Sequence, residues 1–391
     1  MEKVLRQINL ARGWPSLENL RRVAPLVQKW SAASLQAACE SDEAAGSLFG
    51  YCSTCPVVQR DFEISLKDFM SRNGYGSRDK VDRLSITLTP GGSYAIDVCT
   101  RQAIVDLGKR DVALVESPTY YLADRIFGEH NLEVVGVDSD ECGLVPESLE
   151  DMLIRLKNEG KTVQILYTIP GHHNPTSCTL SDERRKRIVE LSQKYDFYII
   201  ADEVYQSLSF QDHEFPPSLA TLDKRVFSVS SFSKIISPGM RLGWISTEAQ
   251  VTVGKGVFES GGNISSYTAA MIHPGLESRE IDKHLSIIRS DLYLRAKTLY
   301  TALQQALGDK GKLFSFAEPQ GGFFLWLEVS PVAGFTTSQF AEEVSKRNVT
   351  FKIQDDGLRL CFAYEPIKDL QIAATRIADA ANACYFIAKA K

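Results

Sequence analysis

Residues 228–241 read Ser-Val-Ser-Ser-Phe-Ser-Lys-Ile-Ile-Ser-Pro-Gly-Met-Arg, and this stretch carries the strongest chemical signal in the chain. Lys234 follows a run of hydroxyl side chains, and Arg241 comes seven positions later, after a Pro-Gly turn. A lysine forms a Schiff base only when its amine is partly deprotonated, which requires desolvation or cationic neighbours. Hydroxyls and a guanidinium together bind a phosphate through charge-assisted hydrogen bonds. The stretch is typical of a site for a phosphorylated aldehyde, although a surface lysine and arginine beside a turn would look the same in isolation.

A glycine turn offers a second group of phosphate ligands. Thr89-Pro-Gly-Gly-Ser93 follows the apolar-alternating run 83–88 and precedes a helical pattern. A strand, a glycine turn and a helix start present free backbone N–H groups and the positive end of a helix dipole, where a phosphate can bind. Taken alone, two glycines before a helix more often mark only a turn.

Two further segments place polar side chains directly after buried-strand patterns. Asn174 follows the apolar run 163–167, and Asp202 and Tyr205 follow the run 197–201. An aspartate at the carboxyl end of a strand can pair with a pyridinium nitrogen and keep the ring an electron sink. Asn174 and Tyr205 can each hydrogen-bond a phenolate oxygen. Taken separately, Asn-Pro more often marks a turn, and an aspartate more often caps a loop.

In this order and spacing, the four segments resemble the class I/II aminotransferases, the fold-type-I family that uses pyridoxal 5′-phosphate. The sequence looks similar to the branch of the aminoadipate- and kynurenine-type transaminases, over nearly the whole chain. Asn174-Pro-Thr matches the family motif NPTG, Asp202-Glu-Val-Tyr205 matches D-x-x-Y, and Ser231-Phe-Ser-Lys234 matches S-F-S-K. Arg241 matches the arginine that follows this lysine.

The resemblance implies a role for each of these residues. Lys234 would form the Schiff base and move the proton in a 1,3-shift, and Asp202 would hold the ring nitrogen. Asn174 and Tyr205 would contact the 3′-oxygen, and Asn174 would contact the substrate as well. The phosphate ligands that the resemblance implies are Gly92, Ser93, Ser231 and Arg241.

The same resemblance identifies residues on the substrate side. Arg359 lies in a segment that matches the family strand "iRLsFa" and would take the substrate α-carboxylate, because a guanidinium meets a carboxylate bidentately. The strip 8–15 matches a segment that folds over the substrate mouth. Arg12 and Trp14 are therefore pocket candidates, with a solvent-exposed tail as an equal alternative. Tyr120 would stack on the cofactor ring, unless it only packs in the core.

Composition excludes several other classes of protein. The 391 residues are 44% hydrophobic and 24% charged, with a net charge of −5 and no basic run dense enough for a nucleic-acid face. The six histidines and eight cysteines show no zinc-ligand spacing, and irregularly spaced cysteines in so long a chain indicate reduced thiols. No segment approaches the roughly 18 apolar residues of a membrane span. We expect a cytoplasmic protein without a metal.

Strand-like and helix-like patterns alternate between residues 84 and 246. The strand candidates are 84–89, 112–116, 132–137, 163–167, 197–201, 226–230 and 242–246, and the helix candidates are 92–107, 146–158 and 181–195. This alternation predicts an α/β fold with a mostly parallel, seven-stranded sheet flanked by helices. Ligands of such sheets bind at the carboxyl ends of the strands, where the polar segments described above fall.

The length of the chain predicts two domains, because 391 residues are too many for one compact core. A long amphipathic helix from Ile281 to Leu307 would lead out of a large cofactor-binding domain, 51–280, into a small α/β domain, 281–391. Residues 1–50 would join the small domain and cover the substrate mouth.

Several positions depart from the family pattern. Tyr51 is the candidate for a tyrosine that reaches the partner subunit's phosphate, although that segment lacks a glycine and an arginine and its register could shift by two. Ser177 replaces a glycine, and Tyr94 and His173 stand where glutamine is usual. We expect these three residues to line the substrate side. Beside transamination between an α-amino acid and a 2-oxo acid, they leave open β/γ-elimination, replacement, cyclisation or oxidation on the same scaffold.

A homodimer with shared active sites is the assembly that the resemblance implies. Tyr51 and the glycine-rich segment 261–267 would cross to the partner, although that segment also reads as an ordinary surface connection. Transcription regulators use this fold behind an N-terminal DNA-binding domain. The strip that begins at Ile8 leaves no room for one, so we expect an enzyme.

Overall fold

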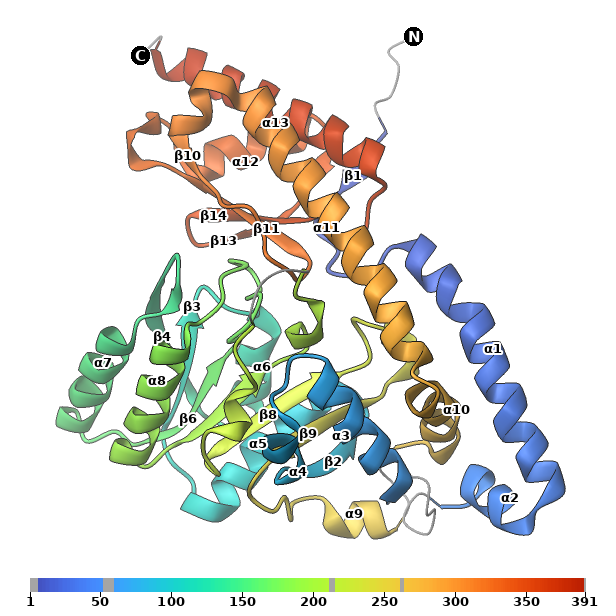
Figure 1. The fold of residues 1–391 in the computed structure, drawn as a ribbon. Coiled ribbons are helices and arrows are strands. Elements are labelled where there is room, and N and C mark those ends of the chain that lie inside the picture. Colours follow the sequence, from blue (N-terminus) through green and yellow to red (C-terminus); the bar gives the residue numbers. More distant parts are fainter. Residues whose placement is uncertain (1–5, 52–59, 211–214, 261–263, 390–391) are drawn as a thin grey trace.

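The structure, a computed structural model, describes residues 6–51, 60–210, 215–260 and 264–389. A large α/β part forms the lower half of the molecule, and a smaller part of sheet and helices sits above it (Figure 1). The helix α11, Glu280–Leu307, runs from one part into the other, as the long amphipathic pattern at 281–307 predicted.

The large part is built on an eight-stranded sheet with the strand order β2-β9-β8-β7-β6-β3-β4-β5. In that order the strands are Ser85–Thr89, Gly243–Thr247, Val226–Ser231, Tyr198–Asp202, Val163–Thr168, Val112–Ser117, Glu133–Asp140 and Gly143–Leu144. The neighbours from β8 to β4 are parallel, whereas β9 is antiparallel to both β8 and β2. All seven predicted strands are present, and the two-residue β5 adds an eighth at the edge.

Continuous burial explains why the central strands read as unbroken apolar runs. Every residue of β6 and of β8 is buried, because helices cover both faces of the sheet (Figure 1). The helices of this part are α3 Phe62–Arg72, α4 Arg78–Asp82, α5 Gly92–Leu107, α6 Tyr121–Glu129, α7 Pro146–Asn158, α8 Asp182–Tyr195, α9 Lys255–Glu259 and α10 Ser266–Glu277. The helices predicted at 92–107, 146–158 and 181–195 are confirmed, and Ser181 caps α8 by accepting from the Arg184 amide.

The smaller part contains a four-stranded antiparallel sheet with the order β10-β11-β14-β13. Its strands are Phe314–Ser315, Phe324–Val329, Gly357–Cys361 and Lys352–Gln354, and its further helices are α12 Thr337–Lys346 and α13 Ile367–Lys389. Short 3-10 helices connect elements in both parts: η3 Gln206–Leu208, η4 Leu219–Thr221, η5 Pro238–Met240, η6 Gly308–Leu313 and η7 Pro331–Ala333.

The N-terminal residues contact both parts of the molecule. The strand β1, Ile8–Asn9, pairs in parallel with β12, Val349–Thr350, of the smaller part. The helices α1, Leu17–Glu40, and α2, Asp42–Phe49, then run down beside the large part, where both contact α10 (Figure 1). The division of the chain at residues 50 and 280 stays a prediction.

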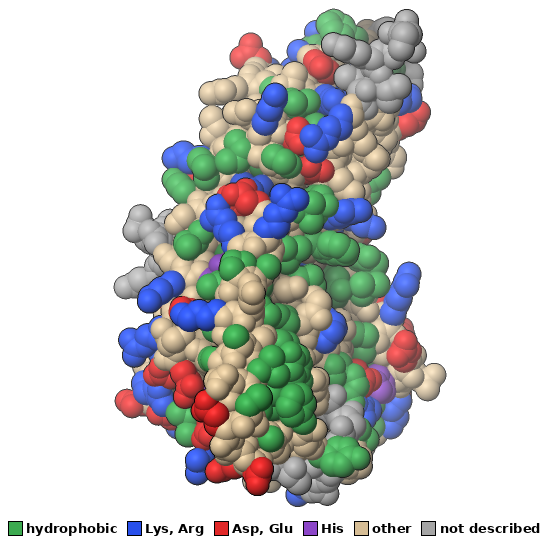
Figure 2. All heavy atoms as spheres, turned by 90° about the vertical axis from the view of Figure 1, so that its right-hand side faces the viewer, with side chains coloured by type: hydrophobic (Ala, Val, Ile, Leu, Met, Phe, Trp, Pro, Cys, Tyr) green, Lys and Arg blue, Asp and Glu red, His purple; other side chains and the backbone are tan. Residues whose placement is uncertain are grey.

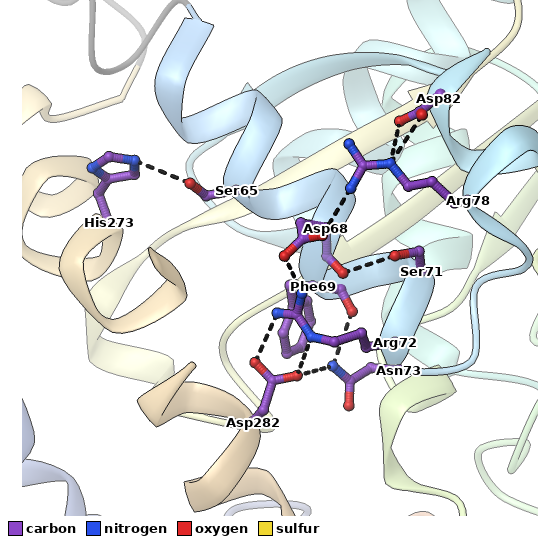
Figure 3. A network of polar contacts seen from close by, with 10 residues as sticks. All are labelled: Ser65, Asp68, Phe69, Ser71, Arg72, Asn73, Arg78, Asp82, His273 and Asp282. Carbon is purple, nitrogen blue, oxygen red and sulfur yellow. Dashed lines mark hydrogen bonds and ion pairs between the residues drawn. The ribbon is translucent and has the colours of Figure 1, made fainter. Parts of the chain in front are cut away.

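A polar network fastens the start of α11 to the large part (Figure 3). Arg72 of α3 donates to both carboxylate oxygens of Asp282, at 3.1 and 3.0 Å, and Asn73 donates to Asp282 Oδ1 at 2.7 Å. The same arginine contacts Asp68, which also accepts from Arg78 at 2.8 Å. Asp282 therefore links the helix that leads to the smaller part with the helix that supports the sheet.

We predict that Asp282→Ala lowers the free energy of unfolding by about 1–3 kcal/mol, because Arg72 and Asn73 lose the acceptor they share. The measurement is the shift of the urea unfolding transition. The control is Asp379→Ala, a change at an exposed carboxylate of α13 that should shift the free energy by no more than about 0.5 kcal/mol. Equal shifts in the two variants would contradict the role of the network.

Candidate active site

A cavity of about 460 Å³ opens at the carboxyl ends of the central strands, between the large part and the sheet of the smaller part. It brings together twelve of the residues predicted for the site, which are Arg12, Trp14, Gly92, Ser93, Tyr120, Asn174, Asp202, Tyr205, Ser231, Lys234, Arg241 and Arg359. Tyr51 lies outside it. The parallel strands explain this convergence, because their carboxyl ends share one edge of the sheet.

Lys234 lies three residues beyond β8, with its amine among aromatic rings. Its Nζ lies 5.6 Å from the ring centre of Tyr205 and 5.7 Å from that of Phe323, and it donates to the Gly13 carbonyl at 2.9 Å. Burial lowers the pKa of Lys234 to about 8, and the nearby Asp202 carboxylate opposes this shift. The amine is therefore neutral at a lower pH than that of a free lysine, as Schiff-base formation requires.

Asp202 is the carboxylate that faces the cavity. It ends β7, and its Oδ2 accepts from the Tyr167 hydroxyl at 2.7 Å, while its Oδ1 accepts weakly from the Val204 amide at 3.4 Å. Burial raises the pKa of Asp202, and donation by Tyr167 lowers it. Its neighbour Glu203 points elsewhere and accepts from the Leu219 amide at 2.8 Å and the Ser228 hydroxyl at 2.5 Å.

Tyr167 is a site-supporting residue that the sequence analysis missed. Its strand β6 lies beside β7, with Tyr167 opposite Ile200, so its ring stands on the same face of the sheet as Asp202 two residues further on. Both side chains are buried, and only one Asp202 oxygen is taken up by the tyrosine. The only signal in the sequence was a tyrosine at the end of an otherwise mostly aliphatic run.

Three chain segments form a cradle that fits a phosphate. The helix α5 begins after Gly91, whose φ of +91° and lack of a side-chain cap leave the first amides open toward the cavity. The hydroxyls of Ser231 and Ser233 lie 2.8 Å apart, and Arg241 reaches across to donate to the Pro90 carbonyl at 2.8 Å. A Cβ at Gly91 would come within 2.4 Å of the Arg241 guanidinium, so this approach requires glycine. Ser233, which also lines the cavity, was not predicted.

Arg359 joins the smaller part to the site. From β14 it donates to Asn174 Oδ1 at 2.8 Å and to the Ala11 carbonyl at 2.7 Å, and its guanidinium lies 4.3 Å from the ring centre of Phe324. Its Nε is buried and has no hydrogen-bond partner among the described residues. A buried donor without a partner is costly, and a substrate carboxylate would satisfy it.

The remaining predicted residues lie at the rim or beyond it. Tyr120 is half-buried after β3, and burial raises the pKa of its phenol to about 12, so the ring stays uncharged. Trp14 is 52% exposed, and Tyr51 is 70% exposed. Of the predicted crossing segment 261–267, residues 261–263 lie outside the described residues.

The expectation that Ser177, Tyr94 and His173 line the substrate side is wrong, since none of them borders the cavity. His173 is buried, 3.0 Å from the Glu116 carboxylate, and Tyr94 borders a separate groove beside β2. Ser177 has a φ of +66°, a conformation that explains why glycine is the usual residue there. These departures from the family pattern therefore give no reason to expect an altered reaction.

Comparisons with known proteins agree with this geometry. The chain matches the family described as aminotransferase class I and II over residues 6–377. It is 30% identical over 313 residues to the aromatic-amino-acid aminotransferase 1 of Thermococcus litoralis, covering 76% of this chain and 73% of that protein. It is also 27% identical over 332 residues to an uncharacterised HTH-type transcriptional regulator of Bacillus subtilis, covering 81% of this chain and 65% of the regulator. A solved kynurenine aminotransferase of Pyrococcus horikoshii has a TM-score of 0.80 at 23% identity, covering 97% of this chain and 92% of that one.

The family match and the fold define a fold-type-I enzyme that uses pyridoxal 5′-phosphate, the cofactor expected from the sequence. The chain belongs to the aminotransferase class I and II family. Solved kynurenine and α-aminoadipate aminotransferases share its fold, and its place in that branch stays a prediction.

We predict that the cofactor-free protein reacts with pyridoxal 5′-phosphate at a rate that rises with pH and levels off above about pH 8. The reason is that burial lowers the pKa of Lys234 to about 8, so the reactive neutral amine predominates above that pH. The measurement is the growth of the absorbance band of the bound cofactor, with Lys234→Ala as the blank. A rate that keeps rising to pH 10 would contradict the shift.

A pair of neighbouring variants tests which carboxylate serves the ring nitrogen. Asp202→Asn should keep the cofactor bound and slow removal of the substrate Cα proton by about 10²-fold or more, because a neutral pyridine is a poorer electron sink. Glu203→Gln should slow it by less than about tenfold and lower the unfolding transition instead, since the Glu203 carboxylate accepts from Leu219 and Ser228, away from the cavity. The measurement is the stopped-flow rate of Cα proton removal from one amino acid in each variant. A slow Glu203→Gln and a near-normal Asp202→Asn would show that Glu203, and not Asp202, serves the ring nitrogen.

Proposed function

We propose that this site moves an amino group from an α-amino acid to a 2-oxo acid, with Lys234 as the residue that carries the cofactor and transfers the proton. The observation that carries the proposal is the meeting of Lys234, Asp202 and Arg359 in one cavity: Lys234 follows β8, Asp202 ends β7, and Arg359 lies on β14 of the smaller part. An amine, a ring-nitrogen partner and a carboxylate ligand are the three groups that this chemistry requires of a protein.

Each residue has a task that its surroundings support. The bound cofactor supplies an electron sink for the bond that breaks at the substrate Cα. Arg359 would hold the α-carboxylate through its unpaired Nε, and Asn174, whose Oδ1 accepts from Arg359, would contact the 3′-oxygen through its amide nitrogen. Lys234 would take the Cα proton as a neutral amine and return it across the nitrogen, at the carbon that was the cofactor's aldehyde carbon. Tyr205 would contact the 3′-oxygen, and Ser93, Ser231 and Arg241 would hold the phosphate.

The proposed working unit is a homodimer with shared active sites. Figure 2 shows apolar side chains gathered on the face that carries α1 and α2. Leu35 and Phe49 of these helices are 39% and 67% exposed, and Tyr51, at 70%, follows directly. An exposed group of large apolar side chains supports a protein contact. Tyr51 would then reach the partner subunit's phosphate.

The proposed location is the cytoplasm, and its support is chemical. The six described cysteines form no disulfide with one another, in keeping with a reducing compartment. No helix in the described part of the chain has both the length and the apolar character needed to cross a membrane.

The function is tested by mixing the protein, loaded with pyridoxal 5′-phosphate, with one amino acid at a time and no oxo acid. Only the first half of the reaction can then take place. We expect one equivalent of 2-oxo acid per site and loss of the original cofactor band. Lys234→Ala should slow this half-reaction by at least about 10³-fold without unfolding the protein. Release of ammonia in place of a matched oxo acid would favour elimination, and near-normal rates in Lys234→Ala would exclude the assignment.

Hybrid dimers test the shared site. If Tyr51 acts in the neighbouring site, mixed Lys234→Ala and Tyr51→Phe subunits form one site with both lesions and one with neither. Activity of the mixture should then rise above that of either variant alone. A fully active monomer in sedimentation, or no recovery in the hybrids, would contradict the shared-site arrangement.

A further inference from the structure

One lysine and one arginine at the mouth of the cavity have no role in the proposed reaction. The cavity is lined by five cationic side chains, which are Arg12, Lys234, Arg241, Lys352 and Arg359. Lys234 serves the cofactor, Arg241 its phosphate and Arg359 the α-carboxylate. Asp202 is the only acidic residue that lines the cavity in the described part of the chain, and it serves the cofactor ring. Arg12 and Lys352 remain.

Lys352 stands beside Arg359 on one face of the small sheet. The register of β13 and β14 places the two residues directly opposite each other, so their side chains share a face with Cβ atoms about 5 Å apart. Like charges in such a pair are destabilising unless an anion lies between them. The arrangement indicates that this face of the sheet can bind a ligand with more negative charge than a single carboxylate carries.

Arg12 approaches the same region from the N-terminal strip. Arg359 donates to the carbonyl of Ala11, the residue directly before Arg12, and so fixes this part of the strip. Arg12 donates to the Tyr364 hydroxyl at 2.8 Å, and its guanidinium lies 5.2 Å from the Tyr364 ring centre and 5.5 Å from the Trp14 ring centre.

Lys352 and Arg12 both lie against aromatic rings rather than against carboxylates. The Lys352 amine lies 5.4 Å from the ring centre of Tyr121, and neither Lys352 nor Arg12 forms an ion pair with a described residue. Nearby acids have other partners: Asp355 accepts from the Ser117 hydroxyl at 3.5 Å, and Glu365 accepts from the Asn9 amide at 2.8 Å. Cation–π contacts position a charge without neutralising it, so both cations stay available for a ligand.

We propose that Lys352 and Arg12 form a second anion subsite, which makes them specificity-determining residues for amino acids whose side chain ends in a carboxylate. The inference rests on the proposed function, because Arg359 is taken to hold the α-carboxylate. The subsite gives a dicarboxylic substrate two anchored ends, with its amino group directed at Lys234 between them. Trp14, Tyr120 and Tyr121 form the walls of the mouth.

Binding of unreactive acids to the loaded protein tests the subsite without turnover. The probes are glutarate and pentanoate, which have the same number of carbons and differ by one carboxylate, together with succinate and adipate for length. The readout is the dissociation constant from the change in the cofactor absorbance. We expect the best dicarboxylate to bind about tenfold more tightly than its monocarboxylate counterpart, and added salt to reduce that ratio.

Variants at Lys352 and Arg12 test whether these residues cause the preference for dicarboxylates. Lys352→Met should bring the ratio of dissociation constants close to one, whereas Lys352→Arg should keep most of it. The matched control is Lys297→Met, which removes a lysine placed 5.5 Å over the Tyr293 ring, outside the cavity. It should leave the ratio unchanged. Arg12→Gln should lower the ratio as well.

The outcomes separate the subsite from the function. The subsite would be overturned if the wild-type ratio of dissociation constants is near one, or if Lys352→Met leaves that ratio unchanged. It would also be overturned, in favour of an aromatic pocket, if 3-phenylpropionate binds more tightly than the dicarboxylates and its affinity does not change in Lys352→Met. If the half-reaction proceeds equally with glutamate and glutamine, the function stands and the subsite fails. If no amino acid reacts but glutarate binding depends on Lys352, the subsite stands and the proposed function fails.

Discussion

The burial of one amine and one carboxylate at the same edge of a sheet is the constraint on which the site depends. Burial disfavours the charged form of both groups, so it lowers the pKa of Lys234 and raises that of Asp202. Each group is stabilised by what surrounds it, since Lys234 donates to the Gly13 carbonyl and Asp202 accepts from Tyr167. Lys234 and Asp202 are thus both positioned to contact one bound cofactor.

The substrate side depends on segments that are far apart in the sequence. Arg359 connects the small sheet both with Asn174 of the large part and with Ala11 of the N-terminal strip. The polar network around Asp282 fixes the start of the helix that carries this sheet (Figure 3). The position of Arg359, the proposed carboxylate ligand, relative to Lys234 therefore depends on how the two parts of the molecule meet.

The sequence analysis missed residues whose role depends on a neighbouring strand. Tyr167 reaches Asp202 only because β6 and β7 are adjacent in the sheet, and Lys352 stands beside Arg359 only because β13 pairs with β14. It also placed Ser177, Tyr94 and His173 on the substrate side because each directly adjoins a motif. None of the three borders the cavity: Tyr94 lies on another face of α5, His173 is buried beside Glu116, and Ser177 has a positive φ.

The sequence by itself determined the order of strands and helices, the cofactor and most of the residues that line the candidate site. Those residues follow buried strands, and the carboxyl ends of parallel strands meet at one edge whatever the details of packing. Tertiary structure decided the rest: which oxygen of Asp202 accepts from Tyr167, that Glu203 binds Leu219 and faces away from the cavity, and that two cations stand at the mouth without an ion-pair partner among the described residues. These features depend on strand register and on contacts between distant segments, which a local pattern of residues does not specify.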